Sequence, residues 1–160
     1  MENPYDKNSI LMMCESLEKK IDVLNQIREM NGKQKEILEN PRSSPDELEE
    51  NLSRKGGLIA ELERLDSGFS TLYEKVREEL MANTGRYADK VNEMKDLIRK
   101  ITALSAAVER EEIDNKELAA KRFSDVRKMA RRIRKNEKAV SSYYKTMSQN
   151  TDPGFMDQKN

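Results

Sequence analysis

Apolar residues recur at intervals of three and four along most of this chain, which is the spacing of an α-helix with one apolar face. The first such run contains Ile10, Met13, Leu17, Ile21, Leu24 and Ile27. Asn40 and Pro41 end the run, because a residue that precedes proline avoids helical backbone angles. The pattern therefore predicts a first helix over about residues 8–39.

A second helix is predicted over residues 45–82. Ser44 can cap it, Pro45 suits its first position, and Glu47 can complete a capping box. Gly56-Gly57 and Asp66-Ser67-Gly68 are candidate kinks. The seven-residue repeat that follows the cap is formed by Leu48, Leu52, Lys55, Ile59, Leu62, Asp66, Phe69, Tyr73, Val76 and Leu80.

The third segment, 86–147, holds the longest repeat, and such a strict repeat predicts a left-handed supercoil. No Gly or Pro occurs between positions 86 and 152, which favours one continuous helix. The alternative is a break near Asp114, which could cap a fourth helix. The positions of the repeat are Tyr87, Val91, Met94, Ile98, Ile101, Ser105, Val108, Glu112, Asn115, Ala119, Arg122, Val126, Met129, Ile133, Asn136, Val140, Tyr143 and Met147.

Together these segments predict an all-α fold, an antiparallel long-helix bundle or coiled coil of three helices. One domain would span residues 1–147, followed by a flexible tail at 148–160. A continuous third helix would extend about 35 Å beyond the others, at about 1.5 Å per residue. The repeat is polar at Glu112, Asn115 and Arg122, so this stretch is not expected in a dry core.

The composition argues against an enzyme. The chain has no His, and it has no strand followed by a glycine-rich phosphate loop. We therefore expect no catalytic residue, no cofactor and no metal. The single cysteine, Cys14, falls near an apolar stripe and is expected to be a buried thiol. No apolar run approaches the ~18 residues of a membrane span, and the polar N-terminus is unlike a signal peptide, so we expect a cytoplasmic protein.

Charge is balanced overall, with 30 basic and 30 acidic residues, but it is unevenly distributed. Four explanations of one basic run stay open: contacts with the acidic start of the second helix (Asp46, Glu47, Glu49 and Glu50), docking of an acidic amphipathic partner helix, contact with nucleic acid, or a basic amphipathic helix on a membrane surface, although its apolar face lacks Trp and Leu. Nucleic acid is also weak, since only Phe123 could stack on a base. The run consists of Lys121, Arg122, Arg127, Lys128, Arg131, Arg132, Arg134, Lys135 and Lys138, opposed by Asp125 and Glu137.

Three segments resemble the FlgN-type flagellar export chaperones, with the FliT type as a near neighbour. The first is Arg54-Lys55-x-x-Leu58-Ile59-x-x-Leu62-Glu63-x-Leu65 in the second helix. The second is Asp114-Asn115-Lys116-Glu117-Leu118 midway along the third. The last is the ending, Tyr143-Tyr144 and then Gly154-Phe155-Met156-Asp157-Gln158-Lys159.

The resemblance implies a cytosolic chaperone that binds hook-filament junction (hook-associated) proteins through their disordered terminal helices. It would keep them unassembled and deliver them to components of the type III export apparatus. The rival hypothesis is a structural coiled-coil protein that forms a homodimer through the long repeat. For the chaperone, the apolar contacts are predicted at Val126, Met129, Ile133, Val140, Tyr143, Tyr144 and Met147, and the steering charges at Arg127, Arg131, Arg134 and Lys138.

Overall fold

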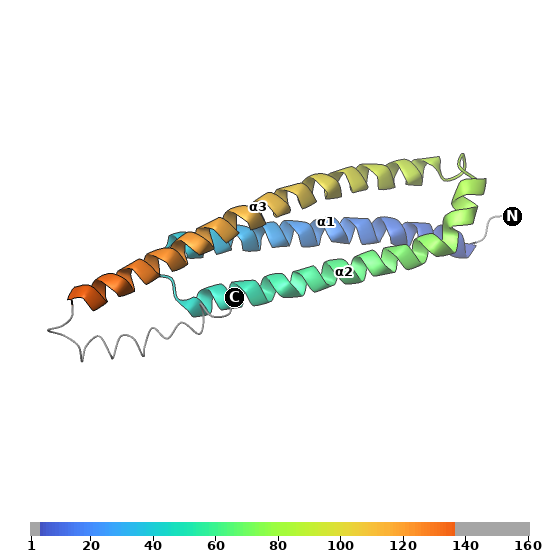
Figure 1. The fold of residues 1–160 in the computed structure, drawn as a ribbon. Coiled ribbons are helices and arrows are strands. Elements are labelled where there is room, and N and C mark those ends of the chain that lie inside the picture. Colours follow the sequence, from blue (N-terminus) through green and yellow to red (C-terminus); the bar gives the residue numbers. More distant parts are fainter. Residues whose placement is uncertain (1–3, 137–160) are drawn as a thin grey trace.

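The computed structural model describes the backbone of residues 4–136 and the side chains of residues 7–132. This part of the chain forms three α-helices and no strand, which confirms the predicted all-α class (Figure 1). The helices are α1 (Pro4–Glu39), α2 (Pro45–Ala82) and α3 (Ala88–Asn136). Because α3 continues through Asp114, the alternative of a break at that point is wrong.

The helix limits follow local sequence signals closely. Helix α1 begins at Pro4, four residues before the predicted start, at a residue that suits a first helical position. The predicted capping box of α2 is present, with Ser44 accepting from the Glu47 amide and Glu47 reaching back to the Ser44 amide. Neither Gly56-Gly57 nor Gly68 ends α2.

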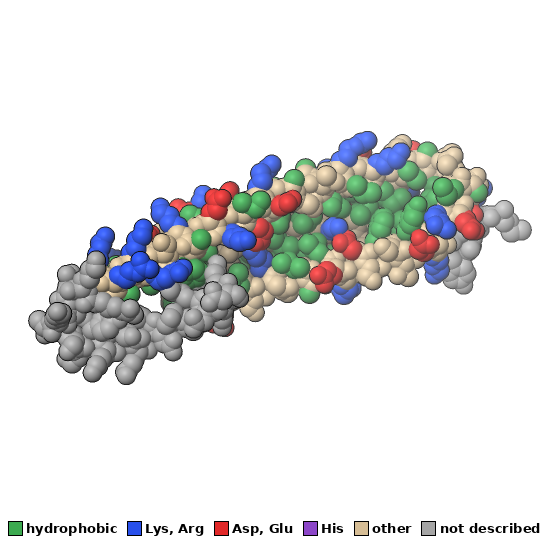
Figure 2. All heavy atoms as spheres, viewed as in Figure 1, with side chains coloured by type: hydrophobic (Ala, Val, Ile, Leu, Met, Phe, Trp, Pro, Cys, Tyr) green, Lys and Arg blue, Asp and Glu red, His purple; other side chains and the backbone are tan. Residues whose placement is uncertain are grey.

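Helix α1 lies between the other two helices and packs along both, whereas α2 and α3 rarely approach each other closely (Figure 1). It runs antiparallel to α2, since Ser16 contacts Leu65 and Met30 contacts Asn51. It runs parallel to α3, since Asn31 contacts Asn115 and Ile37 contacts Arg122. The three helices thus occupy three corners of a four-helix arrangement. A trough remains between α2 and α3, with α1 as its floor, and Figure 2 shows hydrophobic side chains gathered along it.

The main core joins the first half of α1 to the end of α2 and the start of α3. Five α1 side chains, two from α3 and Val76 of α2 are almost fully buried in it. Burying each such side chain contributes about 1.5–3 kcal/mol. These eight residues are Ile10, Met13, Leu17, Leu24, Cys14, Val76, Met94 and Ile101, and Tyr87, just before α3, is buried with them.

The predicted apolar stripe of α2 consists of two columns, each a series of positions seven residues apart. The prediction is wrong for the column that contains Leu52, Ile59 and Tyr73. Leu52, Ile59 and Tyr73 are 44%, 43% and 40% exposed, while Leu65, from outside the predicted stripe, is buried against α1. The same holds on α3, where Ile98 is 45% exposed. Because α2 and α3 each pack mainly against α1, each helix buries chiefly one of its two columns.

The displaced columns form the two walls of the trough. Asp66, seven residues after Ile59, forms an ion pair with Lys20 on the trough side of α1. Glu112, two heptads after Ile98, reaches across to Lys55 of α2. The first contact joins the exposed column of α2 to α1, and the second joins the exposed column of α3 to a buried residue of α2.

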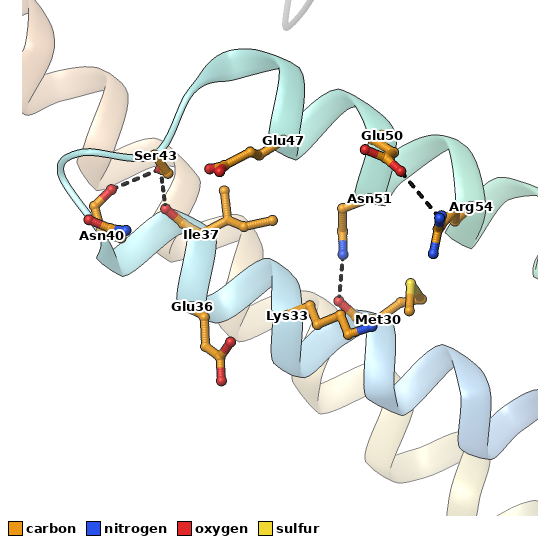
Figure 3. A pocket seen from close by; sticks show the side chains of 10 residues that line it. All are labelled: Met30, Lys33, Glu36, Ile37, Asn40, Ser43, Glu47, Glu50, Asn51 and Arg54. Atoms are coloured by element: carbon orange, nitrogen blue, oxygen red, sulfur yellow. Dashed lines mark hydrogen bonds and ion pairs between the residues drawn. The ribbon is translucent and has the colours of Figure 1, made fainter.

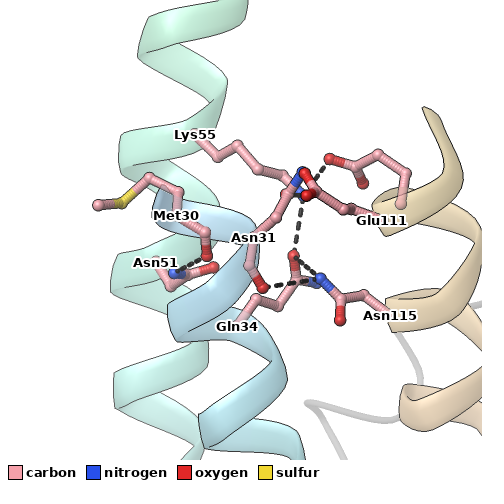
Figure 4. A network of polar contacts seen from close by, with 8 residues as sticks. Met30, Asn31, Gln34, Asn51, Lys55, Glu111 and Asn115 are labelled. Atoms are coloured by element: carbon pink, nitrogen blue, oxygen red, sulfur yellow. Dashed lines mark hydrogen bonds and ion pairs between the residues drawn. The ribbon is translucent and has the colours of Figure 1, made fainter. Parts of the chain in front are cut away.

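A buried polar layer crosses the molecule at mid-length and joins all three helices (Figure 4). The Lys55 ammonium donates to Gln34 Oε1 at 2.8 Å and Asn31 Oδ1 at 3.1 Å. It also pairs with Glu112 Oε1 at 2.6 Å, although only 7% of the Lys55 side chain is exposed. All three donors of the ammonium therefore have a partner, which offsets the cost of burying its charge.

The layer also fixes α3 against α1. The Asn115 side-chain amide donates to Asn31 O at 3.0 Å, and the Asn31 amide donates to Glu111 Oε1 at 3.2 Å. An apolar seven-residue repeat alone tolerates a shift of one heptad, because equivalent side chains replace each other. A polar residue in the seam removes that freedom, since a shift leaves buried polar groups without partners.

We predict that Lys55→Ala lowers the free energy of unfolding by about 2 kcal/mol, because Asn31, Gln34 and Glu112 lose their common donor. Urea unfolding followed by circular dichroism measures the change. Lys100→Ala, at an exposed lysine of α3 with no ion pair in the described residues, is the control and should shift stability by less than about 0.5 kcal/mol. Equal effects of the two substitutions would contradict a structural role for the layer.

Candidate partner-binding surface

Helix α3 runs beyond the end of α1. The last turn of α1 meets α3 where Leu38 packs with Ala119 and Phe123. From Phe123 to Asn136, α3 extends about 20 Å further, at about 1.5 Å per residue. Val126 and Met129 on this extension are 44% and 64% exposed. The prediction that the end of the long helix has apolar surface left uncovered holds for these two described residues.

Arg122 joins the extension to the turn between α1 and α2. Its guanidinium donates to the carbonyl oxygens of Ile37 at 2.9 Å and Ser43 at 3.0 Å, and also to that of Asn40. The last carbonyls of a helix lack intrahelical partners and form the negative end of its dipole. A cation at this point satisfies them and holds the turn against α3.

A hollow of about 560 Å³ lies beside this joint. Its apolar walls come from the end of α1, the turn and the extension of α3. Lys121, Arg122, Asp125 and Glu39 add polar groups at its edge. The apolar lining residues are Leu38, Pro41, Leu118, Val126 and Met129.

The basic run shows no sign of the predicted contact with the start of α2. Among the described residues, no ion pair joins it to Asp46, Glu47, Glu49 or Glu50. Lys121, Arg127, Lys128, Arg131 and Arg132 are instead exposed. Figure 2 shows basic side chains gathered at this end of α3. Within the described residues, these five side chains form no ion pair.

The structure brings only part of the predicted site together. Val126 and Met129 line the hollow, while Arg127 and Arg131 are exposed outside it. Ile133 and Arg134 belong to α3, but their side chains lie outside the described range. Five predicted residues lie outside the described residues altogether: Lys138, Val140, Tyr143, Tyr144 and Met147.

Sequence reasoning missed four lining residues: Leu38, Glu39, Pro41 and Leu118. Leu118 stands eight residues before Val126 in the chain, so helical spacing could have placed it near that residue. Leu38 lies in the last turn of α1 and Pro41 in the turn after it. Only the packing of α1 beside α3 reveals that they line the hollow.

A second hollow, of about 470 Å³, lies between α1 and α2 near their turn (Figure 3). Its charged lining is mixed, with Lys33 and Arg54 set against three glutamates, and Arg54 pairs with Glu50 at 3.3 Å. Met30 and Ile37 supply most of its apolar wall. Fewer apolar side chains line this hollow than the hollow on α3, which makes it a weaker binding site for an apolar partner.

The thiol of Cys14 lies in the core and is not poised to react. Cys14 is 4% exposed, as predicted, and burial followed by the nearby Glu93 carboxylate raises the pKa of its thiol, which disfavours the reactive thiolate. No group of three His, Cys, Asp or Glu side chains in the described part is placed to hold a metal. Among the same residues, no helix is both long and apolar enough to cross a membrane.

No family model, curated protein or solved structure matches this chain in sequence or fold comparisons.

We predict that Arg122→Met loosens the turn between α1 and α2. The substitution removes a charged donor from three backbone carbonyls, of which those of Ile37 and Asn40 keep the Ser43 hydroxyl as a donor, so it should cost about 1 kcal/mol of stability. Amide hydrogen exchange at residues 40–44 should accelerate more than exchange in the main core. Arg132→Met, at an exposed arginine of the same helix, is the control. Unchanged exchange at 40–44 would show that Arg122 does not hold the turn.

Proposed function

We propose that this protein is a flagellar type III export chaperone of the FlgN type, which binds an amphipathic helix of its client. The observation that supports this best is the apolar surface on α3 beyond the end of α1. Val126 and Met129 are exposed there and border a hollow with apolar walls from two helices and a turn. Such a surface suits the apolar face of a partner helix.

The form of the surface is consistent with a carrier that later releases its client. It is short, and it lies on a helix that is anchored at its base by Arg122 and the polar layer. A disordered client segment would have to become helical on binding, which costs a few kcal/mol. That cost keeps affinity moderate without changing the contacts that give specificity.

The class of client comes from the resemblance described above. On that basis the clients are the hook-filament junction proteins, held through their disordered terminal helices in the cytoplasm before delivery to the export apparatus.

Self-association through the extension is the alternative, and charge argues against it. A two-fold symmetric contact places the same surface of both copies face to face. Both facing surfaces would then carry more basic than acidic residues, with Lys121 and Lys128 against Asp125, which is unfavourable at close range.

We predict that the double substitution Val126→Asp and Met129→Asp weakens binding to purified hook-filament junction proteins by at least about thirtyfold. This corresponds to about 2 kcal/mol, the usual loss when an apolar anchor is removed from an interface. Isothermal titration calorimetry on the full chain measures the affinity.

Ile113→Asp is the matched control, because Ile113 is an apolar residue of α3 with 53% exposure that does not line the hollow. It should bind junction proteins like the unsubstituted chain. If the double variant also binds normally, the surface assignment is wrong. If the unsubstituted chain binds no junction protein, the flagellar assignment is wrong.

A further inference from the structure

We infer that this surface accepts an acidic amphipathic helix, and that one edge of α3, formed by Lys121, Lys128 and Arg132, contacts the acidic side of that helix. The inference rests on the proposed function in taking a helix as the partner. It goes further by stating the charge of the partner and by choosing between two sets of basic residues.

Helical spacing separates the basic residues of the extension into two sets. Lys121 lines the hollow, and Lys128 and Arg132 follow it seven and eleven residues later, on the same side of the helix. Arg127 and Arg131 are one turn apart on the far side and do not line the hollow. A helix seated in the hollow would therefore lie beside the first set.

Within the described residues, the charges of the first set have no ion-pair partner. Lys121, Lys128 and Arg132 are all exposed. Arg122, the fourth base on this side, is occupied by the carbonyls of the turn and is unavailable to a partner.

The carboxylates near the hollow do not cancel the positive charge of Lys121, Lys128 and Arg132. Glu39 pairs with Lys35 of its own helix at 3.8 Å. Among the residues that line the hollow, Asp125 is the only acidic one on α3. A partner with carboxylates along one side and a large apolar residue facing Leu118 and Met129 would match both the charge and the apolar walls.

Two other partners fit less well. Nucleic acid would need aromatic side chains for stacking, but Phe123, the aromatic residue of this stretch, is only 6% exposed because it packs beside Leu38 and Leu48. A second copy would bring two basic edges together.

The test uses three designed 21-residue peptides with leucine at the a and d positions of each heptad. Their flanking positions hold glutamate, glutamine or lysine. Fluorescence anisotropy gives the affinity of each labelled peptide for the full chain and for two variants. Lys121→Glu with Lys128→Glu changes the edge beside the hollow, and Arg127→Glu with Arg131→Glu makes the same change of charge on the far side.

We expect the glutamate peptide to bind on the order of tenfold more tightly than the glutamine peptide, and the Lys121/Lys128 variant to lose on the order of tenfold in affinity for it. The Arg127/Arg131 variant should stay within about twofold. The lysine peptide should recover binding to the Lys121/Lys128 variant, which also shows that this variant is folded.

Equal losses in both variants, or equal affinity for the glutamate and glutamine peptides, would overturn the inference. So would displacement of the bound peptide by single-stranded RNA or by vesicles containing anionic lipid, because the site would then recognise polyanions in general. Since these peptides are not flagellar proteins, the inference can survive a failure of the junction proteins to bind, and the reverse also holds.

Discussion

The arrangement of the three helices depends on the polar layer around Lys55. The Lys55 ammonium binds side chains of α1 and α3, and its ion pair with Glu112 joins α2 directly to α3. Apolar heptads supply most of the stabilisation but leave the axial position of α3 undetermined. The layer fixes that position, and with it the point at which α3 passes the end of α1. The exposure of Val126 and Met129 is thus a consequence of polar pairing about twelve residues earlier in the helix.

Local features could be predicted from the sequence, because their causes are local. The ends of α2, its Ser44 capping box and the continuity of α3 follow from caps, breakers and the absence of Gly and Pro. The burial of Lys55 could not be predicted, because lysine is normally exposed and its three acceptors come from two other helices. The exposure of Ile59 and Ile98 could not be predicted either. Periodicity shows which face of a helix is apolar, but not how many neighbouring helices that face contacts.

The binding surface was predicted in part for a similar reason. The excess length of α3 predicted uncovered apolar residues near its end, and Met129 fits that expectation. The hollow needed the packing of α1, since Leu38 and Pro41 complete it from a distant part of the sequence. The basic run could be seen in the sequence, but its division into an edge beside the hollow and a far side required the lining residues.

The central claim is that the end of α3 presents open apolar surface in the free protein. Thiol labelling tests it most directly, with Met129→Cys added to the otherwise unchanged chain and Cys14 as the buried internal reference. The account predicts that the new thiol reacts with a maleimide much faster than Cys14, at a rate independent of protein concentration. A new thiol as slow as Cys14, or one that slows as the protein is concentrated, would contradict it, since the surface would then be covered by the chain itself or by a second copy.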